Sequence, residues 1–294
     1  MSAAAIPTVR ASRRTLSRRK LVSNAMIGLT YAAAVIATLP LILILAHLLR
    51  LGATSVNWTF FTHMPVPAGE SGGGMANAIA GTGMIVIMAS VIGLPVGIGA
   101  GLYLAEHGSD RLATSVRFLS DVLNGLPSIV LGIFAWEMLV RPFRHFSALA
   151  GAVALAAMMI PLVTRTTEEM IRLVPVATRE AALALGYTKW RTSLSVVLRT
   201  ALPGIVTGAL VAVARIAGET APLLFTSFNN RFFSTSLTQP MASLPVQVFT
   251  YAVSPFPDWQ RQAWAGAMVL VAIVVVCSLA ARLAVRRMER MRGV

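Results

Sequence analysis

The sequence has few of the residues from which catalytic and metal sites are built. Of its 294 residues, one is cysteine and four are histidine, and 11 acidic residues stand against 25 basic ones. The single Cys277 excludes a disulfide framework and a thiolate metal cluster. Lys20 and Lys189 are the only lysines, and neither follows the GxxxxG pattern of an ATP-binding phosphate loop. Because paired carboxylates and Ser/His arrangements are also missing, the chain is expected to be non-catalytic and to hold no cofactor or metal of its own.

Charge is scarce along most of the chain, and long apolar runs take its place. Charged residues make up 12% of the sequence and hydrophobic residues 56%, with a mean hydropathy of +0.73. This composition is typical of a polytopic membrane protein. Because a spanning helix needs about 20 largely apolar residues, the sequence predicts an all-α membrane protein with six transmembrane helices. The predicted spans are residues 24–49, 76–105, 117–140, 146–164, 201–225 and 263–285.

The formal charge of +14 is concentrated beside the predicted spans. Basic residues from Arg10 to Lys20 precede the first apolar run, and arginines from Arg282 onward follow the last. The positive-inside rule explains this distribution, so a nucleic-acid partner is not expected, whereas attraction to anionic membrane lipid is. We therefore expect a basic cytoplasmic tail at 1–22, a six-helix transmembrane domain at 23–285 and a second basic cytoplasmic tail at 286–294.

Alternation of the spans places the loops on the two sides of the membrane. Segment 165–200 is expected in the cytoplasm, and segments 50–75 and 226–262 on the outer side. Aromatic residues and prolines in the two outer segments indicate loops that re-enter the membrane or lie at its interface. Five arginines are expected outside, against the positive-inside rule. They are Arg50, Arg141, Arg144, Arg231 and Arg261.

The run Gly125–Ser128 interrupts the third predicted span. Pro127 removes a backbone hydrogen bond, so the helix should kink or open there. Pro95 and Pro161 can bend the second and fourth spans in the same way. Backbone groups freed at such kinks can line a pathway through a membrane protein. A structural bend without contact to a substrate is the alternative.

Two charged residues lie deep within the fifth predicted span. An arginine near the bilayer centre costs about 2.5–3.5 kcal/mol on insertion scales, so Arg215 is expected to face protein or water. Arg215 and Glu219 are spaced i, i+4, which predicts a pair on one helical face. The pair is either a structural clamp or a site where the guanidinium binds an oxyanion, with Glu219 holding or releasing the arginine.

A second charged group lies where the fourth predicted span ends. Arg165 precedes Glu168 and Glu169 at i, i+3 and i, i+4 spacing, which predicts ion pairs along a helix. Asp121 and Asn124, near the inner end of the third span, can complement this group. It is expected at the cytoplasmic mouth, either as a solvated ion pair or as part of a pathway.

Segment 180–205 is polar and helix-prone although it lies between two apolar runs. Thr178 is expected to cap a helix that has Glu180 in its first turn and ends at a left-handed Gly186. The segment resembles the EAA loop of ABC-transporter permeases, a cytoplasmic coupling helix that docks on an ATPase subunit. The departure from that pattern is Arg199, which stands where the family usually has proline. The residues that match the coupling helix are Glu180, Ala181, Ala182 and Gly186.

A longer run of residues limits the resemblance to one family of ABC-transporter permeases. Residues 214–224, ARIAGETAPLL, look like the signature of the PstA family of permeases in phosphate ABC importers. The resemblance implies a type I, MetI-like importer fold that moves inorganic phosphate across a bacterial inner membrane, with both termini in the cytoplasm. It also implies translocation roles for Arg165, Glu168 and Arg215, and the expected pairing adds Glu219.

The resemblance implies partners as well. These are a PstC-like sister permease, a PstB-like ATPase dimer that holds ATP and Mg²⁺, and a PstS-like phosphate-binding protein on the outer side. One alternative is a permease for another oxyanion such as sulfate or molybdate, because a lone arginine does not discriminate tetrahedral oxyanions. A secondary anion transporter is the other, but such proteins usually show two matching halves, and this sequence shows no internal repeat.

Overall fold

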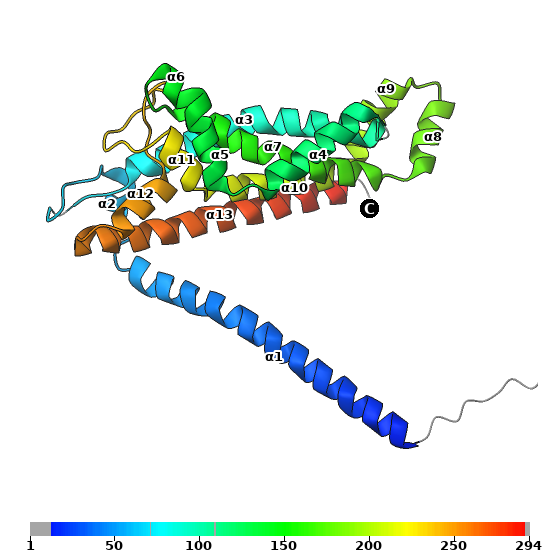
Figure 1. Ribbon diagram of the computed structural model, residues 1–294, viewed down its shortest axis with the longest axis horizontal. Helices are drawn as coiled ribbons and strands as arrows, with labels where there is room; N and C mark the ends of the chain where they lie inside the picture. The colour runs from blue at the N-terminus through cyan, green and yellow to red at the C-terminus, as the bar shows by residue number, and fades with distance from the viewer. Residues whose placement is uncertain (1–12, 71, 109, 292–294) are drawn as a thin grey trace, which may run out of the picture. The chain divides into compact units, whose positions relative to one another are not determined.

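The computed structural model describes residues 13–70, 72–108 and 110–291, and every regular element in these ranges is helical (Figure 1). The predicted all-α fold class is therefore confirmed. Two compact units are present, Met1–Arg50 and Leu51–Val294. The elements are α1 (Arg13–Gly52), α2 (Trp58–Thr62), α3 (Ala76–Glu106), α4 (Arg111–Gly125), α5 (Ser128–Ala135), the π-helical turn η1 (Trp136–Val140), α6 (Arg141–Phe143), α7 (Ala148–Arg172), α8 (Val176–Ala184), α9 (Lys189–Thr192), the π-helical turn η2 (Ser193–Val197), α10 (Leu198–Ala217), α11 (Ala221–Thr226), α12 (Leu244–Ala252) and α13 (Pro257–Met291).

Helix α1 makes up the described part of the first unit. Its stretch from Arg18 to Gly52 contains an 18-residue window with a mean hydropathy of 2.4 and is long enough to cross a membrane. The helix begins at Arg13, inside the segment predicted as the N-terminal tail, and residues 1–12 of that tail lie outside the described residues.

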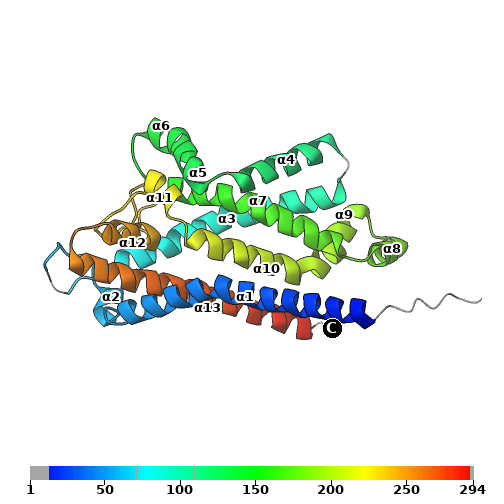
Figure 2. The ribbon, with the colours of Figure 1, turned by 60° about the horizontal axis from the view of Figure 1, so that its bottom comes forward.

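In the second unit, α3 and α7 pack side by side at the centre of a bundle that α10 and α13 complete (Figures 1 and 2). Gly93, Gly97 and Gly101, one turn apart on α3, face α7. A Cβ atom on Gly97 would lie 2.7 Å from Val163 Cβ, and one on Gly101 would lie 2.5 Å from Thr167 Cβ. Glycines at this spacing let membrane helices approach closely, because side chains of one helix pack on the bare backbone of the other.

The third predicted span is broken. Among the described residues, five helices are long and apolar enough to cross a membrane, and α4 with the helical stretch Ser128–Phe143 adds a sixth span if the pair is taken together. The helix predicted over 117–140 consists of these two limbs, which are bent by 107°. The predicted disruption at Pro127 is confirmed, since proline lacks an N–H and holds Leu126 in an extended conformation. Figure 2 shows the two limbs as a V whose arms run toward opposite ends of the bundle.

The fifth predicted span, 201–225, differs from the structure at both ends. Its helical stretch begins at Lys189 and ends at Ala217. Pro222 accounts for the early end, because its ring would clash with the carbonyl of Gly218 if the helix continued. The chain therefore leaves the helix at Gly218 and resumes as α11, whose first turn accommodates Pro222 without loss of a hydrogen bond.

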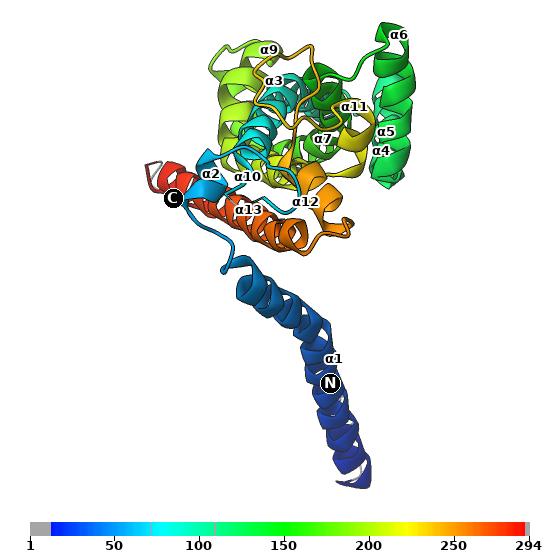
Figure 3. The same cartoon turned by 90° about the vertical axis from the view of Figure 1, so that its left-hand side faces the viewer.

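The second unit has two distinct ends. We call the end with α8, α9 and the C-terminal ends of α3, α7 and α13 the α8 end, and the opposite end with α2, α6, α11 and α12 the α12 end (Figure 1). Figure 3 views the second unit from the α12 end. Segment 226–262 lies at the α12 end and includes α12, which packs on α13 and α3. The backbone N–H of Leu244 in α12 donates to Thr82 Oγ1 of α3 at 2.7 Å, so this loop is fixed to the bundle.

Candidate functional site

A buried carboxylate near the α8 end is surrounded by three arginines. The Glu168 side chain on α7 is 2% exposed. Its Oε1 lies 2.7 Å from Nη2 of Arg117 and 2.7 Å from Nη2 of Arg172, and its Oε2 lies 3.2 Å from Nη1 of Arg165. Removing a carboxylate from water is costly unless cations and hydrogen bonds compensate the charge. These three guanidinium groups supply both.

Asp121 on α4 extends this group of charges. Its two oxygens lie 3.0 Å from Nε and 3.2 Å from Nη2 of Arg165, which is a bidentate contact. Two ion pairs thus cross between α4 and α7, Arg117 with Glu168 and Arg165 with Asp121. With three guanidinium groups and two carboxylates, the group carries a net charge of +1. We call these five residues, Arg117, Asp121, Arg165, Glu168 and Arg172, the Glu168 cluster.

The structure confirms part of the second charged group predicted from the sequence. Arg165 pairs with Glu168, and Asp121 joins them. Glu169 and Asn124 are exposed, and within the described ranges neither takes part in an ion pair. Successive helical residues point roughly 100° apart, so Glu169 faces away from the cluster.

Two members of the cluster were missed in the sequence. Arg172 could have been found, because it follows Glu168 at i, i+4 spacing on the same helix. No local pattern pointed to Arg117, which lies 51 positions before Glu168. Helix α7 continues past the predicted apolar span 146–164 to Arg172, and the charged residues of the cluster lie on this extension.

The predicted pairing of Arg215 with Glu219 is wrong. Because α10 ends at Ala217, Glu219 lies beyond the helix and does not share the helical face of Arg215. Among the described residues, no ion pair joins these two side chains or ties Arg215 to any other acid. Arg215 is exposed, and Glu219 is half-buried. The arginine is therefore a cation beside the break at Gly218, without a carboxylate partner in the described chain.

Helix α8 begins earlier than the sequence indicated. Its first residue is Val176, so Thr178 lies inside the helix and its predicted capping role is wrong. Pro175 explains the start, because it lacks an N–H and a proline is well tolerated where a helix begins. Glu180 consequently lies in the second turn, where it is exposed to solvent.

The predicted left-handed end of α8 is confirmed at Gly186, whose φ is +84°. The N–H of Gly186 donates to the carbonyl of Leu183 at 2.9 Å, and the N–H of Tyr187 donates to the carbonyl of Ala182 at 3.2 Å. This pair of bonds is a Schellman motif, which favours glycine because of its positive φ. The motif turns the chain sharply toward α9.

Large apolar side chains are exposed around α8 and α9. Leu185 is 80% exposed and Trp190 is 69% exposed. Tyr187 lies beneath the guanidinium of Arg191, which is 4.8 Å from its ring centroid. Contiguous exposed apolar residues of this kind mark contact sites for other proteins. We call Leu173, Val176, Leu185, Tyr187 and Trp190 the coupling surface, after the resemblance of this segment to a coupling helix.

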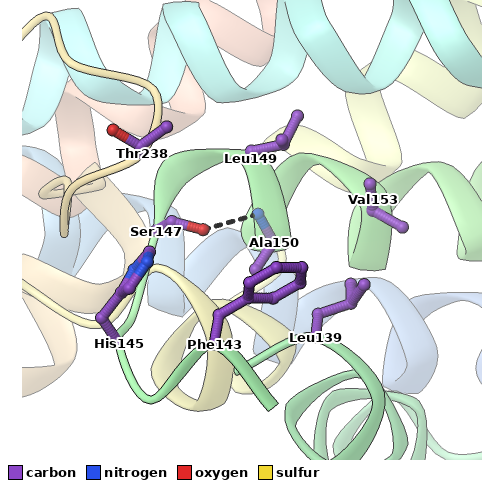
Figure 4. Close-up of a pocket in the computed structure, with 8 residues that line it drawn as sticks. All are labelled: Leu139, Phe143, His145, Ser147, Leu149, Ala150, Val153 and Thr238. Carbon is purple, nitrogen blue, oxygen red and sulfur yellow. Dashed lines mark hydrogen bonds between the residues drawn. The ribbon is translucent and has the colours of Figure 1, made fainter. Parts of the chain in front are cut away.

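A cavity at the α12 end has the wrong chemistry for an anion. It lies between the η1–α6 turn and the start of α7 (Figure 4). Its only polar side chains are His145, Ser147 and Thr238, and the Ser147 hydroxyl already accepts a hydrogen bond from the N–H of Ala150 at 3.1 Å. Leu139 and the other lining residues are apolar, so no permanent cation faces this cavity.

The spans and the broken helix define a polytopic α-helical membrane protein with the fold of ABC-transporter permeases. Solved structures share this fold. A chain of the MetNI methionine ABC transporter has a TM-score of 0.57 and 22% sequence identity, covering 72% of this chain and 92% of that one. A chain of a bacterial ABC transporter involved in the import of alginate has a TM-score of 0.61 and 14% identity, covering 94% and 99%.

The family follows from the sequence itself. Residues 97–291 match the binding-protein-dependent transport system inner membrane component family, and the chain belongs to it. It is 49% identical over 243 residues to a Yersinia pestis protein named phosphate transport system permease protein PstA, with 82% of each chain covered. A Haemophilus influenzae protein of the same name is 44% identical over 266 residues, which cover 90% of this chain and 94% of that relative.

Proposed function

We propose that this chain is the permease subunit of an ATP-driven importer that carries inorganic phosphate across the bacterial inner membrane into the cytoplasm. The observation that carries the proposal is the identity of up to 49% with permeases named for phosphate transport, over most of both chains. The same argument favours phosphate over sulfate or molybdate. The break between α10 and α11 lies within residues 214–224, the run that looks like the signature of phosphate permeases.

Arg215 is the residue proposed to meet the anion. A guanidinium group inside a membrane needs a counter-charge or water, and in the described chain no carboxylate compensates Arg215. A phosphate dianion fits this requirement, because guanidinium binds tetrahedral oxyanions through two parallel hydrogen bonds. Glu219 lies just past the break, and its negative charge lowers the affinity enough for the anion to leave.

The Glu168 cluster is proposed to act as the gate at the α8 end. Arg165 and Glu168 are both fully engaged in ion pairs, so they hold α4 against α7 and do not offer a free charge. A passing anion competes with Glu168 and Asp121 for the guanidinium groups, which loosens the contact between the two helices. The net positive charge of the cluster favours an anion at this point.

The α8 end is proposed to face the cytoplasm and to dock on the ATPase. The exposed Leu185 and Trp190 provide apolar anchors next to the EAA-like residues Glu180, Ala181 and Ala182. A PstB-like ATPase dimer would bind there and hold ATP and Mg²⁺. A PstC-like permease completes the membrane part, and a PstS-like protein delivers phosphate at the α12 end.

The test is labelled phosphate uptake by cells that lack this chain, with and without the chain restored. Restored uptake that excess unlabelled phosphate abolishes, and excess sulfate or molybdate does not, is the expected result. Restored uptake that sulfate blocks would retain the importer and change its substrate. Absence of any restored anion uptake would refute the proposal.

A further inference from the structure

One guanidinium group joins three helices at the α8 end. Arg179 lies on α8, and its Nη1 is 2.6 Å from Oε1 of Glu106, the last residue of α3. Its Nη2 donates to the carbonyl oxygen of Ile171 in the last turn of α7 at 3.3 Å. Both side chains of the ion pair are 24% exposed, so bulk water screens the contact only in part.

The position of this guanidinium is favourable for electrostatic reasons. A carboxylate at the C-terminal end of a helix is unfavourable, because the helix dipole is negative there. Glu106 stands at such a position on α3, and the positive charge of Arg179 compensates both the carboxylate and the dipole. The carbonyl of Ile171 belongs to the C-terminal turn of α7, which also favours a cation.

Little else fixes α8 to these two helices. Ala182 is the only buried residue of α8, and the helix otherwise packs on η2 and α9. Figures 1 and 2 show α8 projecting from the bundle beyond the ends of α3 and α7. Apart from the linker 173–175 that joins α7 to α8, the Arg179 side chain is therefore the principal connection between α8 and the ends of α3 and α7.

The connection continues into the Glu168 cluster. Ile171, which accepts the hydrogen bond from Arg179, lies one turn after Glu168 and directly before Arg172 on α7. Displacement of the end of α7 therefore moves two members of the cluster, and through Arg117 it moves α4. A series of contacts thus runs from Arg179 through the Ile171 carbonyl and the last turn of α7 to the Glu168 cluster and the first limb of the broken span.

We propose that Arg179 is a positioning residue that couples movement of α8 to α3 and α7, and so transmits ATPase docking to the Glu168 cluster. This inference rests on the proposed importer function. It assigns Arg179 and Glu106 a role distinct from that of the coupling surface. The coupling surface binds the ATPase, whereas the Arg179–Glu106 pair passes the resulting motion to the gate.

The test compares variants of the whole transport complex in proteoliposomes. Arg179→Gln and Glu106→Gln each remove the ion pair, and the double exchange Arg179→Glu with Glu106→Arg restores it in reverse. The measured quantities are subunit stoichiometry, ATP hydrolysis with and without the binding protein, and phosphate imported per ATP hydrolysed. Arg141→Gln is the control, because it breaks an exposed ion pair with Glu137 at the α12 end.

Both single variants are expected to assemble normally and hydrolyse ATP, with phosphate imported per ATP reduced at least about fivefold, the lower range of allosteric couplings. The double variant with the reversed ion pair should recover most of the wild-type ratio of phosphate imported per ATP hydrolysed. A wild-type ratio in Glu106→Gln, failure of the reversed pair to recover, or loss of the ATPase subunit from the Arg179→Gln complex would each overturn the inference. If the wild-type complex imports sulfate instead of phosphate, the proposed substrate fails, and the same ratio measured with sulfate decides the role of Arg179.

Discussion

Arg117 and Glu168 are 51 positions apart in the sequence, yet Nη2 of the arginine lies 2.7 Å from Oε1 of the glutamate. This contact fastens the first limb of the broken span to the central helix α7. The ion pair between Arg165 and Asp121 is a second contact between α7 and α4. Movement of α4 away from α7 therefore requires both ion pairs to part, which is the motion that the proposed gate at the α8 end requires.

Replacing Glu168 should be far more damaging than replacing Asp121. Glu168→Gln leaves three guanidinium groups around a neutral side chain that is 2% exposed. Loss of one partner of a buried ion pair typically lowers the free energy of unfolding by about 3–5 kcal/mol. The Asp121 side chain is 52% exposed and meets one arginine, so Asp121→Asn should cost about 1 kcal/mol or less. Thermal unfolding of the purified permease in detergent measures both. Equal shifts in the midpoint would contradict the central position of Glu168.

Arg215→Gln should abolish phosphate uptake and leave stability nearly unchanged. No carboxylate in the described chain pairs with Arg215, so replacing the arginine leaves no buried charge without its partner. The free energy of unfolding should therefore change by about 0.5 kcal/mol or less. Uptake of labelled phosphate and the amount of assembled complex are the two measurements. Arg144→Gln, which changes an exposed arginine at the α12 end, is the control. Normal uptake by the Arg215→Gln variant would show that this arginine is not part of the translocation pathway.

The sequence predicted those features of the site that local rules control. Arg165 and Glu168 share a helical face, and Gly186 ends α8 with a positive φ, so spacing and backbone preference were enough. Arg117 could not be found, because its contact depends on how the broken span packs on α7. The error at Glu219 had a local signal, since Pro222 forbids the helix from continuing past Gly218.

The glycines of α3 give a prediction about packing. Gly97→Ala places a Cβ atom 2.7 Å from Val163 Cβ, so α3 and α7 must separate, and such overpacking typically costs about 1–3 kcal/mol. Gly99→Ala on the same helix meets nothing within 4 Å and serves as the matched control. The thermal midpoint of the purified permease should fall for the first variant and hold or rise for the second. The reverse order would contradict the α3–α7 contact.

Docking of the ATPase should depend on the exposed aromatic residue of α9. Trp190→Ala removes an anchor that is 69% exposed in this chain, and because loss of such an anchor typically costs about 2 kcal/mol, affinity should fall more than about tenfold. Titration of the purified ATPase onto the permease pair measures the change. Trp58→Ala, 79% exposed at the α12 end, should have no effect. Equal losses in the two variants would show that the coupling surface lies elsewhere.

The central claim is that this chain forms the membrane path of an ATP-driven phosphate importer. The most direct test is a purified complex of the chain with its sister permease and ATPase in proteoliposomes, with ATP on the side of α8 and labelled phosphate on the other with its binding protein. We predict phosphate accumulation that requires ATP hydrolysis and persists in excess sulfate. Accumulation that is independent of ATP, or that sulfate suppresses, would contradict the account.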